Sequence, residues 1–173
     1  MVVNFIQFPQ LMRNFTIAVL VLVVLMGCSD ESPKLIKGQP MPGFILDRLE
    51  SGSLDFPNAL RGKVVAIRFW ADWCPFCESE MKNIEPVYQQ NQEQGLVILA
   101  INVRQDRKTA AAFIRKLNIS YDVLLDRDGE VARRYGVIAL PTTFIVDRQG
   151  NLHTRILGES TPEVFHKIVG ELL

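Results

Sequence analysis

The sequence predicts an α/β domain with a central mixed β-sheet flanked by helices. Two continuous apolar runs, 64–70 (VVAIRFW) and 96–103 (LVILAINV), have the β-branched content and length of buried central strands. Each run is followed by a segment with apolar residues every three to four positions, the period of a helix packed on one face. Strands that alternate with such helices are typical of the α/β class.

The other elements follow from the same two periods and from turn residues. Upstream of the first run, 44–56 is expected to form a small extra N-terminal hairpin around Ser51-Gly52. Thr161 and Pro162 supply a capping residue and a first helical proline for the last helix. The remaining expected elements are a helix after Cys77, a helix marked by 110–117, a strand over 122–125, a helix over 130–135, and strands over 143–146 and 152–157 joined by the turn 147–151.

Composition excludes several classes of protein. The chain has 173 residues, with 19 Lys and Arg against 19 Asp and Glu, and no basic run that would bind nucleic acid. The length indicates one domain, and a monomer is expected. Three cysteines are too few for a small scaffold held together by disulfides, so each of them requires another explanation.

The first 27 residues have the pattern of an export signal. The run 15–26 (FTIAVLVLVVLM) follows Arg13 and is shorter than the roughly 20 apolar residues that span a bilayer. It leads into Leu25-Met26-Gly27-Cys28, which resembles the lipobox of bacterial lipoproteins. That resemblance implies a signal peptide over 1–27 (or from Met12) and a lipid on Cys28.

A polar, proline-containing segment over 28–42 would then tether the domain 43–173 to a membrane. The alternative is an uncleaved N-terminal anchor. Either arrangement predicts an exported domain in the cell envelope, held on the periplasmic or extracytoplasmic side of a membrane.

The pair Cys74 and Cys77 stands between the first long strand and its helix. Three-residue spacing on a helical turn brings the two sulfurs within disulfide distance. The positive end of the helix dipole favours a thiolate at Cys74, and Cys77 is placed to attack a mixed disulfide formed there. Neither a metal nor another cofactor is expected, because a zinc site needs four ligands and the only histidines are His153 and His166.

The segments FWADWCPFC and Leu140-Pro141-Thr142-Thr143-Phe144 resemble the thioredoxin superfamily. Together with GKVVAIRFWADWC and the expected anchor, they resemble TlpA/ResA-like membrane-tethered thiol-disulfide oxidoreductases over about 41–173. The resemblance implies a thioredoxin-like fold in which Pro141 is a cis-proline that faces the cysteines. It also implies reduction of protein disulfides, apocytochrome c being one possible substrate, with electrons from a membrane thiol-reducing protein.

Two charged residues lead to competing expectations. Glu80 shares the helix face of Cys77 and Ile84, so it is expected to be partly buried, with a raised pKa, and to accept the proton of Cys77. Arg68 interrupts an apolar strand and needs a partner if it is buried. An Arg68–Glu80 pair would hold Glu80 ionised and contradict the raised pKa, whereas an Arg68 that points to solvent would leave Glu80 free.

The residues around the cysteines suggest where a substrate binds. Trp70 is expected in the core. The predicted contacts are Trp73, Pro75, Phe76, Leu140 and Thr142. Because the dipeptide between the cysteines influences redox potential, and Pro75-Phe76 departs from the usual TlpA-like order, the direction of electron flow stays open between a reductase and an oxidase or isomerase. A thioredoxin-fold copper-binding module is the alternative of another class, and a peroxiredoxin is disfavoured because no T-x-x-C motif is present.

Overall fold

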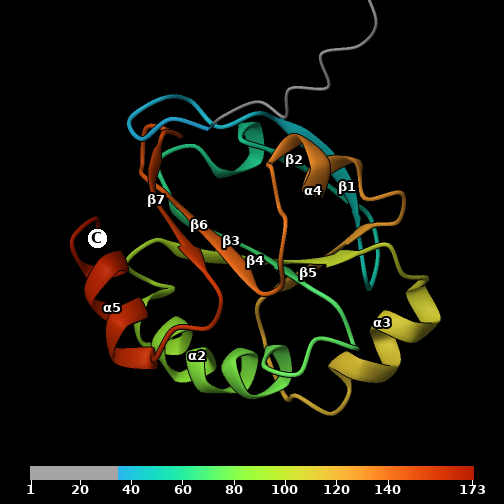
Figure 1. The fold of residues 1–173 in the computed structure, drawn as a ribbon. Helices are drawn as coiled ribbons and strands as arrows, with labels where there is room; N and C mark the ends of the chain where they lie inside the picture. The colour runs from blue at the N-terminus through green and yellow to red at the C-terminus, as the bar shows by residue number, and fades with distance from the viewer. Residues whose placement is uncertain (1–34) are drawn as a thin grey trace, which may run out of the picture. The chain divides into compact units, whose positions relative to one another are not determined.

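A computed structural model describes residues 35–173, which form a mixed β-sheet with helices on both faces (Figure 1). The strands of this part of the chain lie in the order β2-β1-β5-β4-β3-β6-β7. The elements are β1 (Phe44–Arg48), β2 (Ser53–Phe56), the 3-10 turn η1 (Asn58–Leu60), β3 (Val64–Trp70), α2 (Cys77–Asn91), β4 (Leu96–Val103), α3 (Arg107–Ile114), β5 (Asp122–Asp126), α4 (Glu130–Arg134), β6 (Thr142–Val146), β7 (Leu152–Leu157) and α5 (Pro162–Gly170).

The two apolar runs form the centre of the sheet, as predicted. β3 and β4 pair in parallel from Val64 with Leu96 to Trp70 with Asn102. On its other side β3 pairs antiparallel with β6, so the sheet is mixed. Every residue of β3 is buried, which explains why its sequence does not alternate between apolar and polar residues.

Helix α3 begins earlier than the apolar period indicated. It starts at Arg107 rather than near Ala110, because Asp106 caps it and accepts a hydrogen bond from the Thr109 N–H at 2.7 Å. The predicted N-terminal hairpin is confirmed as the antiparallel pair of β1 and β2.

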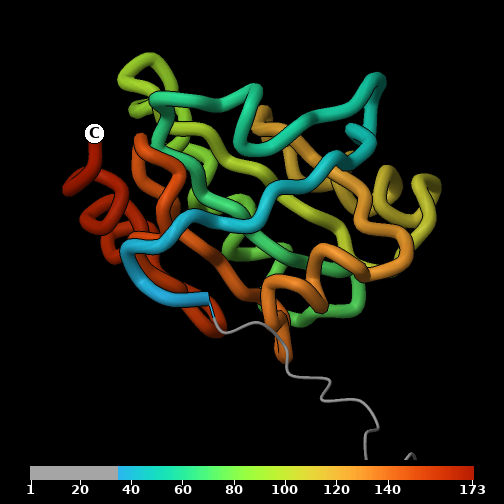
Figure 2. The backbone as a smooth tube through the Cα atoms, turned by 90° about the horizontal axis from the view of Figure 1, so that it is seen from above, coloured from blue at the N-terminus to red at the C-terminus, as the bar shows by residue number. Residues whose placement is uncertain are grey.

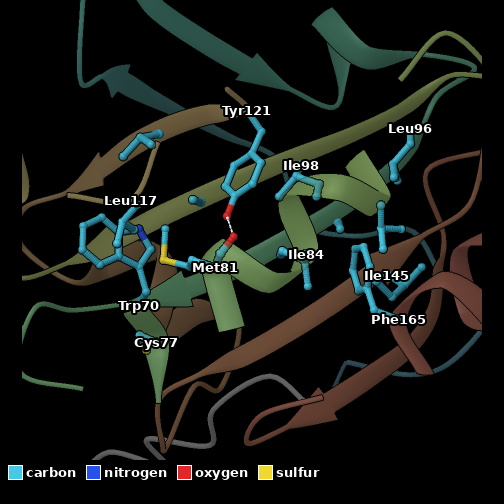
Figure 3. Packing of buried hydrophobic residues seen from close by; sticks show 14 of the residues in the cluster. Trp70, Cys77, Met81, Ile84, Leu96, Ile98, Leu117, Tyr121, Ile145 and Phe165 are labelled. Atoms are coloured by element: carbon cyan, nitrogen blue, oxygen red, sulfur yellow. Dashed lines mark hydrogen bonds between the residues drawn. The ribbon is translucent and has the colours of Figure 1, made fainter. Parts of the chain in front are cut away.

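Each face of the sheet carries its own apolar core. Helices α2, α3 and α5 cover one face and α4 lies on the other (Figure 1). Figure 3 shows the core beneath α2, where the Tyr121 hydroxyl donates a hydrogen bond to the Met81 carbonyl at 2.8 Å. The opposite core is rich in aromatic rings, including Phe44, Phe69 and Phe144. The cysteine pair therefore belongs to the α2 side of the sheet.

The end of the predicted tether packs on the domain. The Gly38 N–H donates to the Leu152 carbonyl at 2.7 Å, and the Met41 N–H donates to the Gly150 carbonyl at 3.0 Å. Figure 2 shows this segment running beside the start of β7. The predicted signal peptide, Cys28 and the first part of the tether lie outside the described residues. Within residues 35–173, no helix is long and apolar enough to cross a membrane.

Candidate active site

Cys74 and Cys77 form a disulfide where β3 passes into α2. Their Cα atoms are 5.4 Å apart, and the Cys77 N–H donates to the Cys74 carbonyl at 3.2 Å. Cys77 is the first residue of α2, so Cys74 lies one turn before the helix, at its positive end. Both cysteines are buried in this oxidised state, Cys77 completely. The predicted close pair is confirmed.

The two tryptophans beside the cysteines have opposite environments. Trp70 is fully buried and stacks on Phe113 with ring centroids 4.9 Å apart, as expected of a core residue. In contrast, Trp73 is 68% exposed and Phe76 is 51% exposed. Ile138, which no sequence motif marks, is the most exposed large apolar residue of the described chain at 84%. The disulfide is therefore bordered by an apolar surface.

The loop before β6 carries the predicted cis-proline. The Leu140–Pro141 peptide bond is cis, as expected, and the Pro141 carbonyl accepts a hydrogen bond from the Gly158 N–H at 2.9 Å. Thr142 turns its side chain inward, where its hydroxyl donates to the Ala139 carbonyl at 2.7 Å. Thr142 is only 1% exposed and its backbone pairs with β3 and β7, so the contact predicted for Thr142 has no exposed surface in this structure.

Arg68 and Glu80 form a buried ion pair, with exposed fractions of 0% and 3%. Side chains alternate along a strand, so Arg68 shares the α2 face of β3 with Ala66 and Trp70. The Arg68 Nη1 atom also lies 3.3 Å from Thr143 Oγ1 on the neighbouring strand β6. The structure thus contains the pair predicted as one of the two competing arrangements, and Arg68 does not reach solvent.

The second oxygen of the Glu80 carboxylate is bound by Ser160. The Ser160 N–H and hydroxyl donate to Glu80 Oε1 at 2.8 and 3.0 Å. Because Ser160 lies two residues after Gly158, this segment connects the active-site helix to the loop of Pro141. Nothing in the sequence identified Ser160, which stands 80 positions from Glu80.

Two further residues maintain the shape and electrostatics of the site. Burial raises the pKa of Tyr121, so its phenol stays protonated and binds the Met81 carbonyl of α2. The Asp72 N–H donates to Gln105 Oε1 at 3.0 Å, which ties the loop before Cys74 to the segment after β4. Residues 35–173 contain no group of three or more His, Cys, Asp or Glu side chains that could hold a metal ion.

Comparison with known proteins identifies the family. The sequence matches the AhpC/TSA family over residues 37–155. The thiol-disulfide oxidoreductase ResA of Bacillus cereus is 31% identical over 137 residues, which is 79% of each chain. ResA of Geobacillus thermodenitrificans is 32% identical over 154 residues, covering 86% of this chain and 88% of its own.

A solved structure of similar fold agrees with these relatives. The thiol:disulfide interchange protein DsbE of Chlorobium tepidum is 26% identical, with a TM-score of 0.76 over 80% of this chain and 99% of DsbE. The relatives and the solved structure are thus thiol-disulfide proteins. This chain has a disulfide at the strand–helix junction and a cis-proline in the loop before β6. The chain belongs to the AhpC/TSA family and, within it, to the ResA-like thiol-disulfide oxidoreductases with a thioredoxin-like fold.

Proposed function

We propose that this protein reduces disulfide bonds in exported proteins through a cycle of Cys74 and Cys77. The observation that carries the proposal is the position of the pair, at the positive end of α2 and beside the exposed side chain of Trp73. A thiolate at Cys74 is favoured there, and the apolar rim can bind an unfolded or extended substrate. The relatives named ResA support the same class of reaction.

The reaction balances as two thiol-disulfide exchanges. The Cys74 thiolate attacks one sulfur of the substrate disulfide and releases the other as a thiolate. The Cys77 thiolate then attacks Cys74, which closes the Cys74–Cys77 disulfide and releases the second substrate sulfur. Two electrons pass from the protein to the substrate, whose thiolates take up two protons. A membrane dithiol reductant outside this chain returns the pair to its reduced form.

Glu80 is proposed as the acceptor of the Cys77 proton. It lies three residues after Cys77 on α2, one helical turn away on the same face. Its carboxylate is buried between the guanidinium of Arg68 and the N–H and hydroxyl of Ser160, which fix its position on this face of the helix. Glu80→Gln removes that base, so thiol-disulfide exchange should become slower, and the double variant Arg68→Met/Glu80→Gln, which leaves no unpaired buried charge, should be equally slow. Equal exchange rates in the variant and the original protein across pH would contradict the role.

The cellular setting completes the proposal. A signal peptide over 1–27 and a lipid on Cys28 would hold a monomeric domain at the outer side of a membrane. There its substrates would be exported proteins, apocytochrome c before haem attachment being one. Mass spectrometry of the N-terminal peptide of the mature protein tests this directly, because an unmodified Cys28 or an intact segment 1–27 would contradict lipid anchoring.

Substrate trapping tests the function as a whole. Cys77→Ala removes the resolving thiol, so Cys74 should retain its substrates as mixed disulfides. The matched control is Cys74→Ala, which should trap nothing because it removes the attacking thiol and leaves only Cys77, whose exposed fraction is 0%. Recovery of exported proteins with the first variant alone supports the proposal. If only small thiols were recovered, a protein substrate would be excluded.

The redox potential of the Cys74–Cys77 couple decides the direction. A reductase needs a couple near the thioredoxin value of about −270 mV, and a strong oxidant has about −120 mV, a difference of roughly 7 kcal/mol for two electrons. Equilibration of the full chain with glutathione buffers would measure it. A redox potential close to that of the strong oxidant would contradict the reductase function and favour an oxidase.

A further inference from the structure

A cavity of about 580 Å³ opens beside the redox centre. Its walls include Trp73, next to Cys74, and Leu140, next to the cis-proline. Residues that are distant in sequence thus contribute to one hollow that reaches Trp73, the neighbour of Cys74. The apolar side chains Val137 and Ile138 extend its lining.

The two charged residues that line this cavity are both arginines, Arg104 and Arg133. Within the described part of the chain, neither of them has a carboxylate at ion-pair distance. Arg133 donates to the Asp128 carbonyl at 2.8 Å, while the Asp128 carboxylate accepts from the Glu130 N–H at 2.9 Å. The cavity therefore has a positive rim whose charge is not cancelled by a direct ion pair.

Arg104 has an uncommon backbone conformation. Its φ angle of +56° lies in the left-handed region, which few residues other than glycine adopt. Its side chain crosses Gly129, where an added Cβ would meet Arg104 Nε at 2.5 Å. Such outliers concentrate at functional sites, and here the outlier is a residue that lines the cavity.

From this combination we infer that the cavity is a substrate subsite that prefers an acidic side chain next to the disulfide-bonded cysteine. The apolar rim of Trp73 and Ile138 would contact an extended chain, and the two arginines would bind its carboxylates. This inference rests on the proposed function, because it names the class of protein segment that the Cys74–Cys77 pair reduces. Opposite charges at such a rim mainly accelerate encounter, so the effect is expected in kcat/KM.

The test compares short disulfide-cyclised peptides that differ only beside one cysteine, where they carry Glu, Gln or Lys. The reduced full-length protein is mixed with each peptide, and oxidation of Cys74 and Cys77 is followed through the fluorescence of the neighbouring Trp73. The Glu peptide should be reduced about three- to tenfold faster than the Gln peptide, and the Lys peptide should be slowest. High salt should bring the three rates together.

Variants of the two arginines test whether the preference for an acidic peptide comes from the cavity. Arg104→Gln and Arg133→Gln should each reduce the ratio of Glu to Gln rates, and Arg104→Lys should restore most of it. Arg61→Gln is the matched control, because Arg61 is exposed in the loop before β3 and does not line the cavity. This control should keep the ratio of the original protein.

The outcomes separate the inference from the proposed function. If no peptide is reduced, the reductase proposal is wrong, and the proposed subsite is then wrong as well. If all three peptides are reduced at equal rates at low salt, the reductase stands and the acidic subsite is wrong. The peptide series uses the original protein, so its outcome does not depend on whether Arg104→Gln folds.

Discussion

The two sides of the disulfide differ in what they contain. On the inner side, Arg68 and Glu80 form an ion pair shielded from water, and Ser160 binds the remaining carboxylate oxygen. On the outer side, Trp73 and Ile138 expose most of their apolar surface. Charge is thus buried and paired, whereas apolar surface faces solvent, the reverse of the usual distribution.

The inner side holds the fold together around the thiols, and the outer side offers a surface for a substrate. A buried pair contributes little net stability, but it leaves a costly unpaired charge when one partner is lost. Through Arg68, Glu80 and Ser160, the inner side connects α2 to β3, β6 and the segment before α5. Exposed apolar side chains contribute little to folding and provide a surface for another molecule. We expect changes on the inner side to alter stability and thiol chemistry, and changes on the outer side to alter substrate binding.

The largest effect is expected from Arg68→Met, which leaves the Glu80 carboxylate buried without a counter-charge. The free energy of unfolding of the oxidised full chain should fall by about 3–5 kcal/mol, measured by urea denaturation. The double variant Arg68→Met/Glu80→Gln removes both charges and should lose clearly less. A double variant that loses as much as Arg68→Met would show that the cost does not come from the unpaired charge of Glu80.

Trp73→Ala tests the outer side. It should lower kcat/KM for a protein disulfide about tenfold, or about 1.4 kcal/mol, because a large apolar contact is lost. Its unfolding free energy should stay within about 0.5 kcal/mol of the original, since Trp73 is exposed.

The control for Trp73→Ala is Val164→Ala, which removes an exposed apolar side chain from α5. This variant should leave both kcat/KM and stability unchanged. A stability loss in Trp73→Ala as large as its loss in activity would show that Trp73 supports the fold, and the contrast between the two sides would break down.

Ser160→Ala is expected to have a smaller effect on the inner side. The hydroxyl bond to Glu80 is lost while the backbone N–H bond remains, so stability should fall by about 1 kcal/mol. The pH dependence of thiol-disulfide exchange by the reduced protein should also shift, because the proposed proton acceptor Glu80 loses a hydrogen-bond donor. Ser51→Ala, in the exposed hairpin turn, is the matched control. A pH profile of exchange identical to that of the control would show that Ser160 does not influence the thiols.

The smallest effect concerns Asp126, which binds the start of α4 through the N–H groups of Val131 and Ala132. Burial raises the pKa of Asp126 above its ordinary value of 3.8, despite these two bonds. The folded protein then binds this proton more tightly than the unfolded chain, so the stability contributed is complete below 3.8 and is lost as pH rises through the raised pKa.

Asp126→Asn removes this titration. Urea unfolding between acidic and neutral pH should therefore show the variant gaining on the original protein as pH rises through that window. A stability difference that stays constant with pH would contradict the assignment. Asp126, at the end of β5, binds the first turn of the helix that carries Arg133, so this measurement also tests whether the wall of the cavity depends on that contact.

Much of this protein could be predicted from local sequence. The runs 64–70 and 96–103 became β3 and β4 with the same bounds, because apolar β-branched residues have few alternatives to a buried strand. The C-x-x-C motif placed Cys74 and Cys77 together, since their spacing is one helical turn. These predictions depend on contacts between near neighbours.

The tertiary structure decided what depends on distant pairing. Arg68 had two possible orientations in the sequence, and only the register of β3 in the sheet turned it toward α2. Ser160 and Arg104 had no sequence signal at all. Their roles follow from loops that approach Glu80 and Trp73 in space. A local pattern determines which face of an element is apolar, but the partner of a buried charge is set by the packing of elements far apart in the chain.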